Sequence, residues 1–334
     1  MKKWLVQFLS LLVLTEIMVW GAVDEGNAQV SQQKREMEFV RKLRKELEQL
    51  ASEQKFSGAV LLAKGDQILL KEGYGFEDPA ANVLNKSETK FHLASVTKVF
   101  TAVAILQLAQ AGEFSLEDKV VRVLPNYPNR EAAEKITIRQ LLTHRSGLCN
   151  CFGKFVQLDF ARYQTPESFL RVFANDPLEF EPGAKYSYSN AGYVVLGSIV
   201  RAASGQRYEE YVEKRIFAPA GMRNSEWITG ETRGLNAIGG ARSTVENLFR
   251  FSRALQERKL LSKEYTELEL AGLAGMSAEK INGLDVVGHI GSAPGMSTSL
   301  DIYPELGFTV VILSTLDGAA IRVRDQFREE LTRR

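Results

Sequence analysis

The stretch Ala94-Ser-Val-Thr-Lys-Val-Phe-Thr-Ala-Val-Ala-Ile-Leu-Gln-Leu-Ala-Gln-Ala111 decides how the chain is organised. Its apolar residues lie on most faces of a helix, so residues 96–111 are predicted to form a helix that is surrounded by protein. Gly112 ends this helix. The remainder of the chain must therefore supply the layers around it.

Strand-forming segments lie on both sides of this helix in the sequence. Residues 57–65 and 67–75 are apolar runs joined by a Gly-Asp turn, which predicts a β-hairpin. Residues 284–290, 298–303 and 308–314 also have strand character, and a final helix is predicted at 319–331. Residues 32–54 carry apolar side chains at a spacing of three to four, which predicts a helix that packs against a sheet.

The middle of the chain differs from both ends. Residues 113–227 contain helical segments and few alternating runs, broken by Pro125, Pro128, Pro166, Pro177, Pro182 and Pro219. The expected fold class is therefore α/β of the α+β type, with an antiparallel sheet flanked by helices, built from both chain ends, and a mostly helical inserted subdomain. We expect one domain at 29–334, in which 29–112 and 228–334 form the α/β part and 113–227 the helical part.

Composition excludes several classes of protein. The 334 residues are 45% hydrophobic and 25% charged, which is ordinary for a globular protein with a large core. The net charge is +1, and basic residues are scattered among acidic ones. Such a balance argues against a nucleic-acid partner.

The first 28 residues have the pattern of a secretory signal peptide. Lys2 and Lys3 precede a short apolar run that Glu16 interrupts before it reaches the length of a membrane-spanning helix, and small residues end the segment near Ala28. We expect export to the periplasm or the extracellular space, with no stable membrane span after cleavage. The alternative is an uncleaved N-terminal anchor.

The chain has two cysteines, Cys149 and Cys151, with Asn150 between them. A disulfide across one intervening residue is strained. We therefore interpret the cysteines as two loop thiols, and the alternatives are a labile redox pair or half of a metal site.

Several common catalytic motifs are absent, among them Gly-x-Ser-x-Gly, His-Glu-x-x-His, a Walker loop and a Rossmann glycine set. What remains is Ser-x-x-Lys, which places a hydroxyl and an amine one helical turn apart. The pattern occurs five times, at Ser31 to Lys34, Ser52 to Lys55, Ser87 to Lys90, Ser95 to Lys98 and Ser277 to Lys280.

Only Ser95 stands at the start of a helix predicted to be buried. The N-terminus of that helix offers free backbone N–H groups, and burial would lower the pKa of Lys98. The other four pairs lie in polar surroundings, where a lysine stays protonated. The alternative is that Ser95 is a simple helix cap and Lys98 is exposed.

Two further elements carry candidate chemistry. Tyr188 and Asn190 lie in a turn before an apolar helix and could point into one cleft. His289, Gly291 and Ser292 lie on a predicted strand, where glycine often marks the close approach of another backbone or a ligand. Alternatively, Asn190 caps the helix and His289 is a structural histidine.

Taken together, these elements resemble the serine β-lactamase and penicillin-binding-protein superfamily, within it the class C β-lactamase-like branch. Tyr188-Ser-Asn190 matches the Tyr-x-Asn motif of that branch, and His289-Ile-Gly291 matches the His-x-Gly that replaces Lys-Thr-Gly in many members. The resemblance extends over residues 56–317 and implies a β-lactamase/transpeptidase-like fold.

The resemblance also implies a mechanism. Ser95 would form an acyl-enzyme, Lys98 and Tyr188 would share the proton transfers, and Asn190 would orient Lys98 and the substrate. The backbone N–H groups of Ser95 and Ser292, beside Gly291, would form the oxyanion hole. His289 would border the site and could hydrogen-bond Tyr188 or a substrate carboxylate. His144 resembles a structural element of the family, and His92 has no assigned role.

The change from Lys-Thr-Gly to His-Ile-Gly removes a permanent cation that would hold a drug carboxylate. The implied substrate is a small-molecule or peptide ester or amide, and the implied activity is that of an esterase, a D-amino-acid peptidase or carboxypeptidase, or a weak β-lactamase. Nothing in the sequence calls for a metal or an organic cofactor. The alternatives are a non-catalytic module of the same fold that recognises peptidoglycan-like peptides, and a purely structural protein.

Overall fold

The computed structural model describes residues 34–78, 80–155, 157–159, 162–228 and 233–333. Residues 53–334 form one compact unit, and the described part of the other unit is a single helix at 34–52. This helix agrees with the one predicted at 32–54, and its packing against a sheet stays a prediction. The predicted signal segment at 1–28 lies outside the described residues. Among the described helices, none combines the length and the apolar character that crossing a membrane requires.

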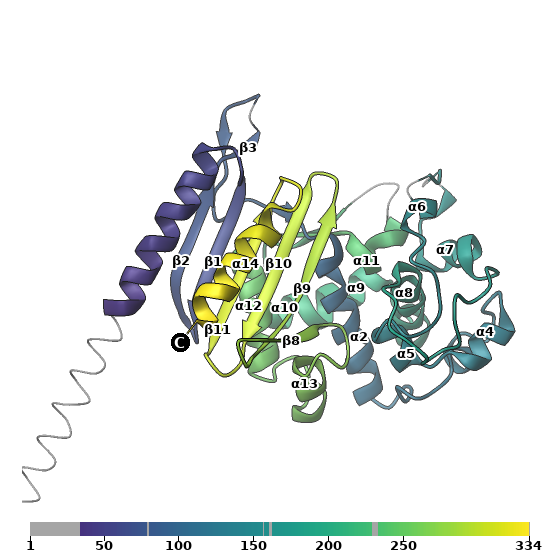
Figure 1. Ribbon diagram of the computed structural model, residues 1–334. Coiled ribbons are helices and arrows are strands. Elements are labelled where there is room, and N and C mark those ends of the chain that lie inside the picture. Colours follow the sequence, from purple (N-terminus) through teal and green to yellow (C-terminus); the bar gives the residue numbers. More distant parts are fainter. Residues whose placement is uncertain (1–33, 79, 156, 160–161, 229–232, 334) are drawn as a thin grey trace, which may run out of the picture. The chain divides into compact units, whose positions relative to one another are not determined.

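The larger unit is built on a six-stranded antiparallel sheet with the strand order β2-β1-β11-β10-β9-β8. The strands are β1 (Gly58–Lys64), β2 (Gln67–Tyr74), β8 (Ser277–Ile281), β9 (Leu284–Ala293), β10 (Met296–Tyr303) and β11 (Phe308–Ser314). Strand β1 pairs with β11 from Gly58 opposite Ser314 to Lys64 opposite Phe308. The first and the last strand of the larger unit therefore pair inside one sheet (Figure 1), as the fold class predicted.

Helices cover both faces of this sheet. Helix α14 (Ala319–Thr332) contacts β10 and β11 and lies in front of the sheet in Figure 1, whereas α12 (Val245–Gln256) contacts β1 and β11 from behind. Alternate residues of β1 point to opposite faces, and all of Gly58 to Ala63 are buried. Burial on both faces explains why β1 is a continuous apolar run.

The central helix is α2 (Lys98–Gln110), and a 3₁₀ turn at Ala94–Thr97 lies directly before it. Most of its residues are buried, because α8 (Asn190–Ser204), α9 (Tyr208–Val212) and α11 (Asn236–Gly239) all pack against it. The helix predicted at 96–111 is thus present, with its first turn wound more tightly. Ser95 lies in that tight turn, and Lys98 is the first residue of α2.

The inserted part is mostly helical, as predicted. Besides α8 and α9, it contains the helices α3 (Val120–Val123), α4 (Arg130–Lys135), α5 (Ile138–Leu142), α6 (Phe152–Phe155), α7 (Pro166–Phe173) and α10 (Ala218–Ala220). Side chains cap the starts of α5 and α7: Thr137 accepts a hydrogen bond from the backbone of Gln140, and Thr165 accepts one from the backbone of Ser168, next to Pro166 as the first helical residue.

Some short elements were not predicted. Helix α13 (Lys263–Leu270) and strand β8 lie in a region whose sequence shows no periodic pattern. Two small sheets are made of short strands: β3 (Phe76–Asp78) pairs with β4 (Val83–Leu84), and β7 (Ala241–Ser243) lies between β5 (Phe91–His92) and β6 (Glu226–Trp227). Strands of two or three residues are too short to show an alternating pattern. The β5–β7 pair nevertheless matters, since Leu93 N–H donates to Ala241 O and so fixes the chain just before Ser95.

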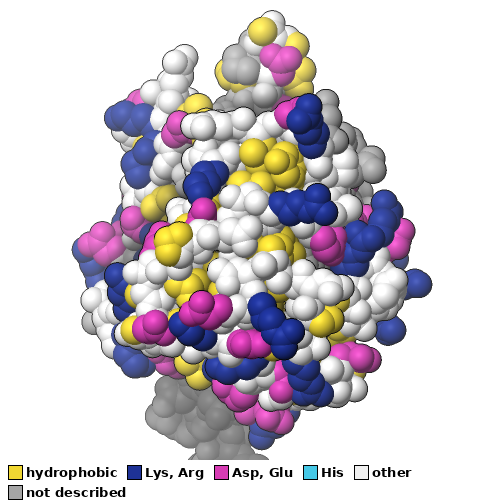
Figure 2. Space-filling model, turned by 90° about the vertical axis from the view of Figure 1, so that its right-hand side faces the viewer, with side chains coloured by type: hydrophobic (Ala, Val, Ile, Leu, Met, Phe, Trp, Pro, Cys, Tyr) yellow, Lys and Arg dark blue, Asp and Glu magenta, His cyan; other side chains and the backbone are white. Residues whose placement is uncertain are grey.

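The surface carries charges of both signs. On the face drawn in Figure 2, Lys and Arg side chains are interspersed with Asp and Glu side chains, and small apolar areas lie between them. No charge of one sign dominates that face.

Candidate active site

Ser95 and Lys98 face each other across the first turn of the central helix. Lys98 Nζ lies 3.3 Å from Ser95 Oγ, and the Lys98 side chain is fully buried. Ala94, the preceding residue, has a φ of +46°, a backbone conformation that residues other than glycine rarely adopt. Such strain is often found beside catalytic groups.

The surroundings of Lys98 consist of two carbonyl oxygens in an otherwise buried site. Lys98 Nζ donates to Asn190 Oδ1 at 2.7 Å and to Ile238 O at 2.8 Å. Burial lowers the pKa of Lys98 well below its ordinary value of 10.5. In its neutral form the amine would donate its two N–H groups to these carbonyl oxygens and keep a lone pair for the Ser95 hydroxyl.

Tyr188 lies beside this pair. Among the described residues its buried hydroxyl has no hydrogen-bond partner. Burial raises the pKa of the Tyr188 phenol to about 12. Lys98 Nζ is 5.3 Å from the centre of the Tyr188 ring. Tyr188 is thus a neutral phenol with an uncommitted proton next to Ser95.

His144 supports Tyr188 from behind. Its ring centre lies 4.4 Å from that of Tyr188 and 5.0 Å from that of Tyr193. His144 Nδ1 accepts a hydrogen bond from the Ser189 backbone N–H, and burial lowers the pKa of His144 to about 3. A neutral, buried imidazole of this kind holds the Tyr188-Ser189 segment in place.

Strand β9 forms the opposite wall. A Cβ on Gly291 would lie 2.4 Å from Leu93 O and 2.9 Å from Ser95 N, so the strand passes directly against the turn that holds Ser95. Thr298 Oγ1 on β10 donates to Leu93 O at 2.8 Å and ties the same turn to the sheet. Ser292 follows Gly291 and borders the same cavities as Ser95.

His289 lies on this strand, partly buried, two residues before Gly291. Its Nδ1 is 2.6 Å from Ile290 O. Burial and the neighbouring Lys98 lower the pKa of His289 to about 4, so the imidazole is neutral at pH 7. The hydrogen bond that we considered between His289 and Tyr188 is absent, because the Tyr188 hydroxyl has no partner among the described residues.

Two cavities meet at Ser95. The first, of about 390 Å³, is bordered by Tyr186, Tyr188, Glu279, His289, Arg324 and Arg328. The second, of about 370 Å³, is mainly apolar and is bordered by Phe152, Ile228, Leu235, Ile238, Ala293 and Met296. Ser95, Tyr188 and Ser292 border both cavities. A substrate carbonyl at Ser95 would therefore have a polar region on one side and an apolar region on the other.

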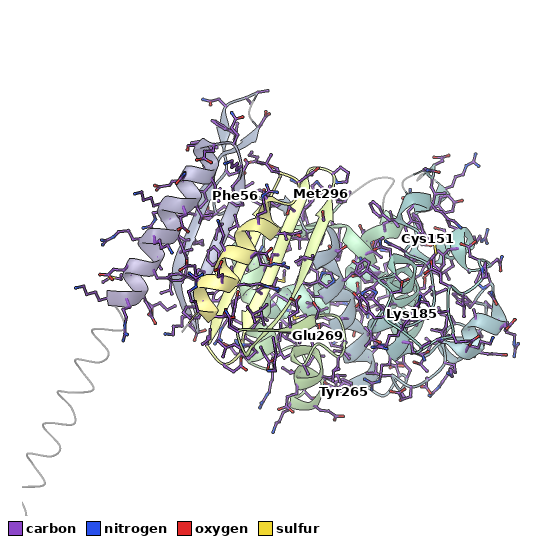
Figure 3. All side chains as sticks on the ribbon, viewed as in Figure 1. Phe56, Cys151, Lys185, Tyr265, Glu269 and Met296 are labelled. Atoms are coloured by element: carbon purple, nitrogen blue, oxygen red, sulfur yellow. A yellow bond between two sulfur atoms is a disulfide. The ribbon has the colours of Figure 1, made fainter. Side chains whose placement is uncertain are left out.

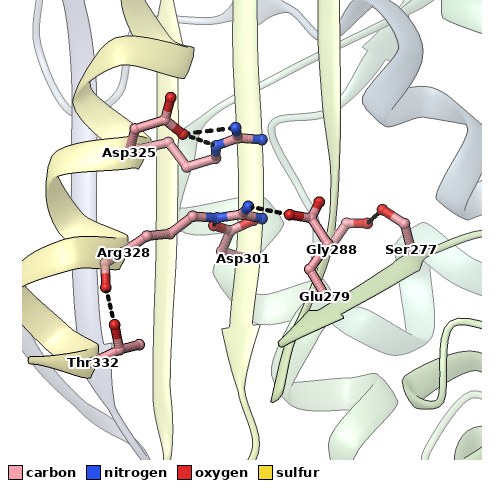
Figure 4. Close-up of polar contacts among 8 residues, drawn as sticks. Ser277, Glu279, Gly288, Asp301, Asp325, Arg328 and Thr332 are labelled. Carbon is pink, nitrogen blue, oxygen red and sulfur yellow. Dashed lines mark hydrogen bonds and ion pairs between the residues drawn. The ribbon is translucent and has the colours of Figure 1, made fainter. Parts of the chain in front are cut away.

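The far end of the polar cavity is a charge network (Figure 4). Arg328 Nε donates to Asp301 Oδ2 at 2.6 Å, and Arg328 Nη1 donates to Glu279 Oε2 at 2.9 Å. Arg324 pairs with Asp325. Because the acidic groups engage both arginines, the network joins α14 to the sheet and leaves no unpaired cation among these residues.

The structure corrects the interpretation of the two cysteines. Cys149 and Cys151 form a disulfide and are not two loop thiols. Their sulfurs and Asp176 lie within 4.8 Å of one another, but disulfide sulfurs are not thiolate ligands, so the metal-site alternative does not describe this state. Figure 3 labels Cys151 on the helical part and Met296 at the β9–β10 hairpin.

The other Ser-x-x-Lys pairs lie elsewhere. Where they are described, their lysines form surface ion pairs: Lys55 with Glu53, Lys90 with Glu226 and Lys280 with Asp285. Ser31 lies outside the described residues. Ser95 and Lys98 are thus the pair that combines hydrogen-bond contact with burial.

Comparison with known proteins gives the family. A family model described as Beta-lactamase matches residues 43–332. The chain belongs to the beta-lactamase family. One relative is penicillin-binding protein 4* of Bacillus subtilis (strain 168). It is 30% identical to this chain over 318 residues, and the match covers 80% of this chain and 70% of that protein.

Solved structures agree with this assignment. The penicillin-binding protein of Bacillus halodurans has a TM-score of 0.75 and 28% identity to this beta-lactamase family chain, and the match covers 85% of this chain and 98% of that one. The D-amino acid amidase of Ochrobactrum anthropi SV3 shares the fold, with a TM-score of 0.75, 20% identity and coverage of 87% and 97% of the two chains. The fold and the superfamily implied by the three motifs are confirmed.

Sequence reasoning missed several groups at the site. Ile238 contributes a backbone carbonyl, which no side-chain motif can reveal. Asn150 lies between the two cysteines and accepts a hydrogen bond from Asn190. Glu279 lies on β8, a strand whose polar sequence gives no periodic signal.

Proposed function

We propose that this protein is a serine hydrolase that forms an acyl-enzyme at Ser95 from ester or amide substrates. The observation that carries the proposal is the fully buried Lys98, whose Nζ lies 3.3 Å from Ser95 Oγ and whose pKa is lowered by burial. A neutral amine at this distance is a general base for the serine hydroxyl.

In the first step Lys98 Nζ takes the proton of Ser95 as Ser95 Oγ bonds to the substrate carbonyl carbon. The carbonyl π electrons move to oxygen, and the backbone N–H groups of Ser95 and Ser292 stabilise the resulting oxyanion. Asn190 Oδ1 and Ile238 O, which are 2.7 and 2.8 Å from Nζ, stabilise the ammonium group that forms.

The leaving group then needs a proton. Tyr188 is a neutral phenol, so it passes its proton to the leaving oxygen or nitrogen and regains one from Lys98. The bond from the carbonyl carbon to the leaving group breaks, and Ser95 stays acylated. Water attacks the acyl-enzyme by the same route, with Lys98 again as the base, and releases the acid and the free serine.

The two cavities suggest a substrate class. The apolar cavity beside Ser95 suits an apolar acyl group, and the polar cavity bordered by Glu279 and His289 suits a polar or charged leaving group. Because neutral His289 replaces a permanent cation, strong binding of a β-lactam carboxylate is not expected. We favour an esterase, an amidase or a D-amino-acid peptidase or carboxypeptidase over an efficient β-lactamase, in a protein exported with the help of residues 1–28.

Intact-protein mass spectrometry tests the proposal. Residues 29–334 are exposed to a fluorophosphonate and, separately, to a penicillin, beside Ser95→Ala. A Ser95-dependent adduct with the fluorophosphonate supports the activated nucleophile, and a lasting penicillin adduct indicates a penicillin-binding enzyme. If neither reagent labels the protein, the function is not that of a serine hydrolase, and binding of peptidoglycan-like peptides that survives Ser95→Ala becomes the alternative.

A further inference from the structure

The segment Cys149-Asn150-Cys151 lies against the site, and the mechanism above does not use it. We propose that the Cys149–Cys151 disulfide holds Asn150 as a positioning residue for Asn190, so that acylation of Ser95 requires the oxidised form of the two cysteines. The inference rests on the proposed function, since it concerns the same acylation step.

A chain of hydrogen bonds leads from Asn150 to the base. Asn190 Nδ2 donates to Asn150 Oδ1 at 2.6 Å, and Asn190 Oδ1 accepts from Lys98 Nζ at 2.7 Å. The two ends of the Asn190 amide are therefore fixed by different partners. Without Asn150, the amide could turn over and present N–H groups to Lys98, which would break the bond that orients the amine.

Asn150 needs an external restraint to serve in this way. Its side chain is exposed, and the segment belongs to no helix or strand until α6 begins at Phe152. Exposed loop side chains ordinarily sample several conformations. The disulfide closes a ring around Asn150, and Cys151 is held at a φ of +57°, where residues other than glycine are rarely found.

A second contact ties the same segment to the site. Ser189 Oγ donates to Cys149 O at 2.8 Å and accepts from Gly192 N–H at 2.9 Å at the start of α8. The disulfide loop is thus attached to both Ser189 and Asn190, the two residues that follow Tyr188. A displacement of the loop would reach Tyr188 and Asn190 together.

Reduction is the direct test. A dithiol such as dithiothreitol donates two electrons and two protons, the Cys149–Cys151 bond becomes two thiols, and the dithiol is oxidised to its cyclic disulfide. Both cysteines are partly buried but not enclosed, and the chain has no others, so the reagent acts at this pair alone. The mass increase of the two added hydrogens reports the state of the protein.

The rate of fluorophosphonate labelling at Ser95 is compared between the oxidised form, the reduced form and a form reoxidised with a small disulfide. We expect the labelling rate to fall about tenfold or more on reduction, in keeping with the loss of a partner of the base, and to recover on reoxidation. Equal rates in the oxidised and reduced forms overturn the inference but not the proposed function. No labelling in either form overturns the proposed function and the inference with it.

Two matched variants separate positioning from general damage to the loop. Asn150→Leu keeps the size of the side chain and removes the acceptor, so labelling should slow about as much as on reduction. Asn150→Asp keeps an acceptor for Asn190 Nδ2, so labelling should persist. Its negative charge should raise the pKa of Lys98, so the acidic limb of the pH profile of the labelling rate should move to higher pH. An Asn150→Leu variant that labels at the wild-type rate, with an unchanged pH profile, contradicts the positioning role.

The double variant Cys149→Ser/Cys151→Ser completes the test. It should label as slowly as the reduced protein and be insensitive to the dithiol. If it labels as fast as the oxidised wild type, the disulfide has no part in positioning Asn190, and the inference is wrong.

Discussion

Gly291 lies so close to Ser95 that no side chain fits between them: a Cβ on Gly291 would be 2.9 Å from the backbone nitrogen of Ser95. The same Cβ would be 2.4 Å from Leu93 O. This contact gives a physical reason for the glycine in His289-Ile-Gly291. It brings the β9 backbone, and with it Ser292, to the turn where the proposed oxyanion hole lies.

Gly291→Ala should therefore damage the site more than the fold. The added methyl group forces β9 away from the Ser95 turn, at a cost of about 1 to 3 kcal/mol for an overpacked position, and we expect acylation of Ser95 to slow about 100-fold. Fluorophosphonate labelling and urea unfolding measure the two effects. Gly153→Ala is the control, because a Cβ there meets nothing within 4 Å. Wild-type labelling by Gly291→Ala would show that the close approach is unimportant.

The protonation of Lys98 should govern the pH profile. Because the free amine is the active form, kcat/KM should fall as the pH drops through the lowered pKa of Lys98 and level off above it. Tyr188, with a pKa of about 12, should add no alkaline limb in the working range. Lys98→Arg, which stays protonated, should lose about 1,000-fold or more in kcat/KM. A profile that is flat from about pH 5 to about pH 9 would argue against Lys98 as the base.

Tyr188→Phe should separate activity from stability. The Tyr188 hydroxyl is buried without a partner among the described residues, so its removal breaks no hydrogen bond and should leave Tm unchanged or raise it. The loss of the proton donor should lower kcat about 100-fold.

Tyr193 provides the matched control, since its buried hydroxyl donates to Leu142 O at 3.1 Å. Tyr193→Phe should cost about 1 kcal/mol of unfolding free energy and leave kcat nearly unchanged. If Tyr188→Phe instead lowers Tm and spares kcat, the hydroxyl has a structural partner and no role in proton transfer.

The Asp301–Arg328 pair should stabilise α14 on the sheet. Asp301 is fully buried, and both of its carboxylate oxygens accept from Arg328. Arg328→Met leaves the buried Asp301 carboxylate unpaired and should cost about 3 to 5 kcal/mol. Asp301→Leu should cost less, because Arg328 keeps its hydrogen bond to Glu279. The double variant should lose much less than the sum of the two, as measured by urea unfolding. Additive losses would show that the two groups act independently.

Glu269 should make stability depend on pH. Its carboxylate is fully buried, accepts from the backbone N–H groups of Gly275 and Met276, and has its pKa raised from 4.5 to about 7 by burial. Between these two values the folded state binds more protons than the unfolded state, so the unfolding free energy should fall as the pH rises through this window. The total fall should be about 3 kcal/mol, at about 1.4 kcal/mol per pKa unit.

Urea titrations of the wild type and Glu269→Gln at several pH values measure this effect. The variant cannot ionise, so its unfolding free energy should lack this component of the pH dependence, whatever its absolute stability. Identical slopes for the two proteins would exclude Glu269 as the cause.

Much of the fold followed from local patterns. The apolar runs of β1 and β11 and the continuous apolar surface of α2 could be recognised in the sequence, because each element buries the side chains that define it. The edge strand β8 could not be predicted from the sequence, because most of its side chains are exposed and show no hydrophobic period.

The candidate site was partly readable for a related reason. Ser95 and Lys98 are neighbours along one helical turn, so their spacing in the sequence carries their geometry. Lys98 and the Ile238 carbonyl are 140 positions apart in the sequence, and Asn190 and Asn150 are 40 positions apart. No local sequence pattern encodes such contacts. The disulfide could not be predicted, because one intervening residue indicates strain, and the positive φ of Cys151 (+57°) is not visible in the sequence.

The pairing of β1 with β11 has a consequence for how the chain reaches its native state. During synthesis β1 emerges early, yet its partner at residues 308–314 is made almost last, so the centre of the sheet cannot close until nearly the whole polypeptide is available. Contacts between such distant segments also make folding slow. Until then β1 presents an open, apolar edge to other chains, which makes the nascent protein a client for chaperones and leaves a C-terminally truncated product prone to aggregation.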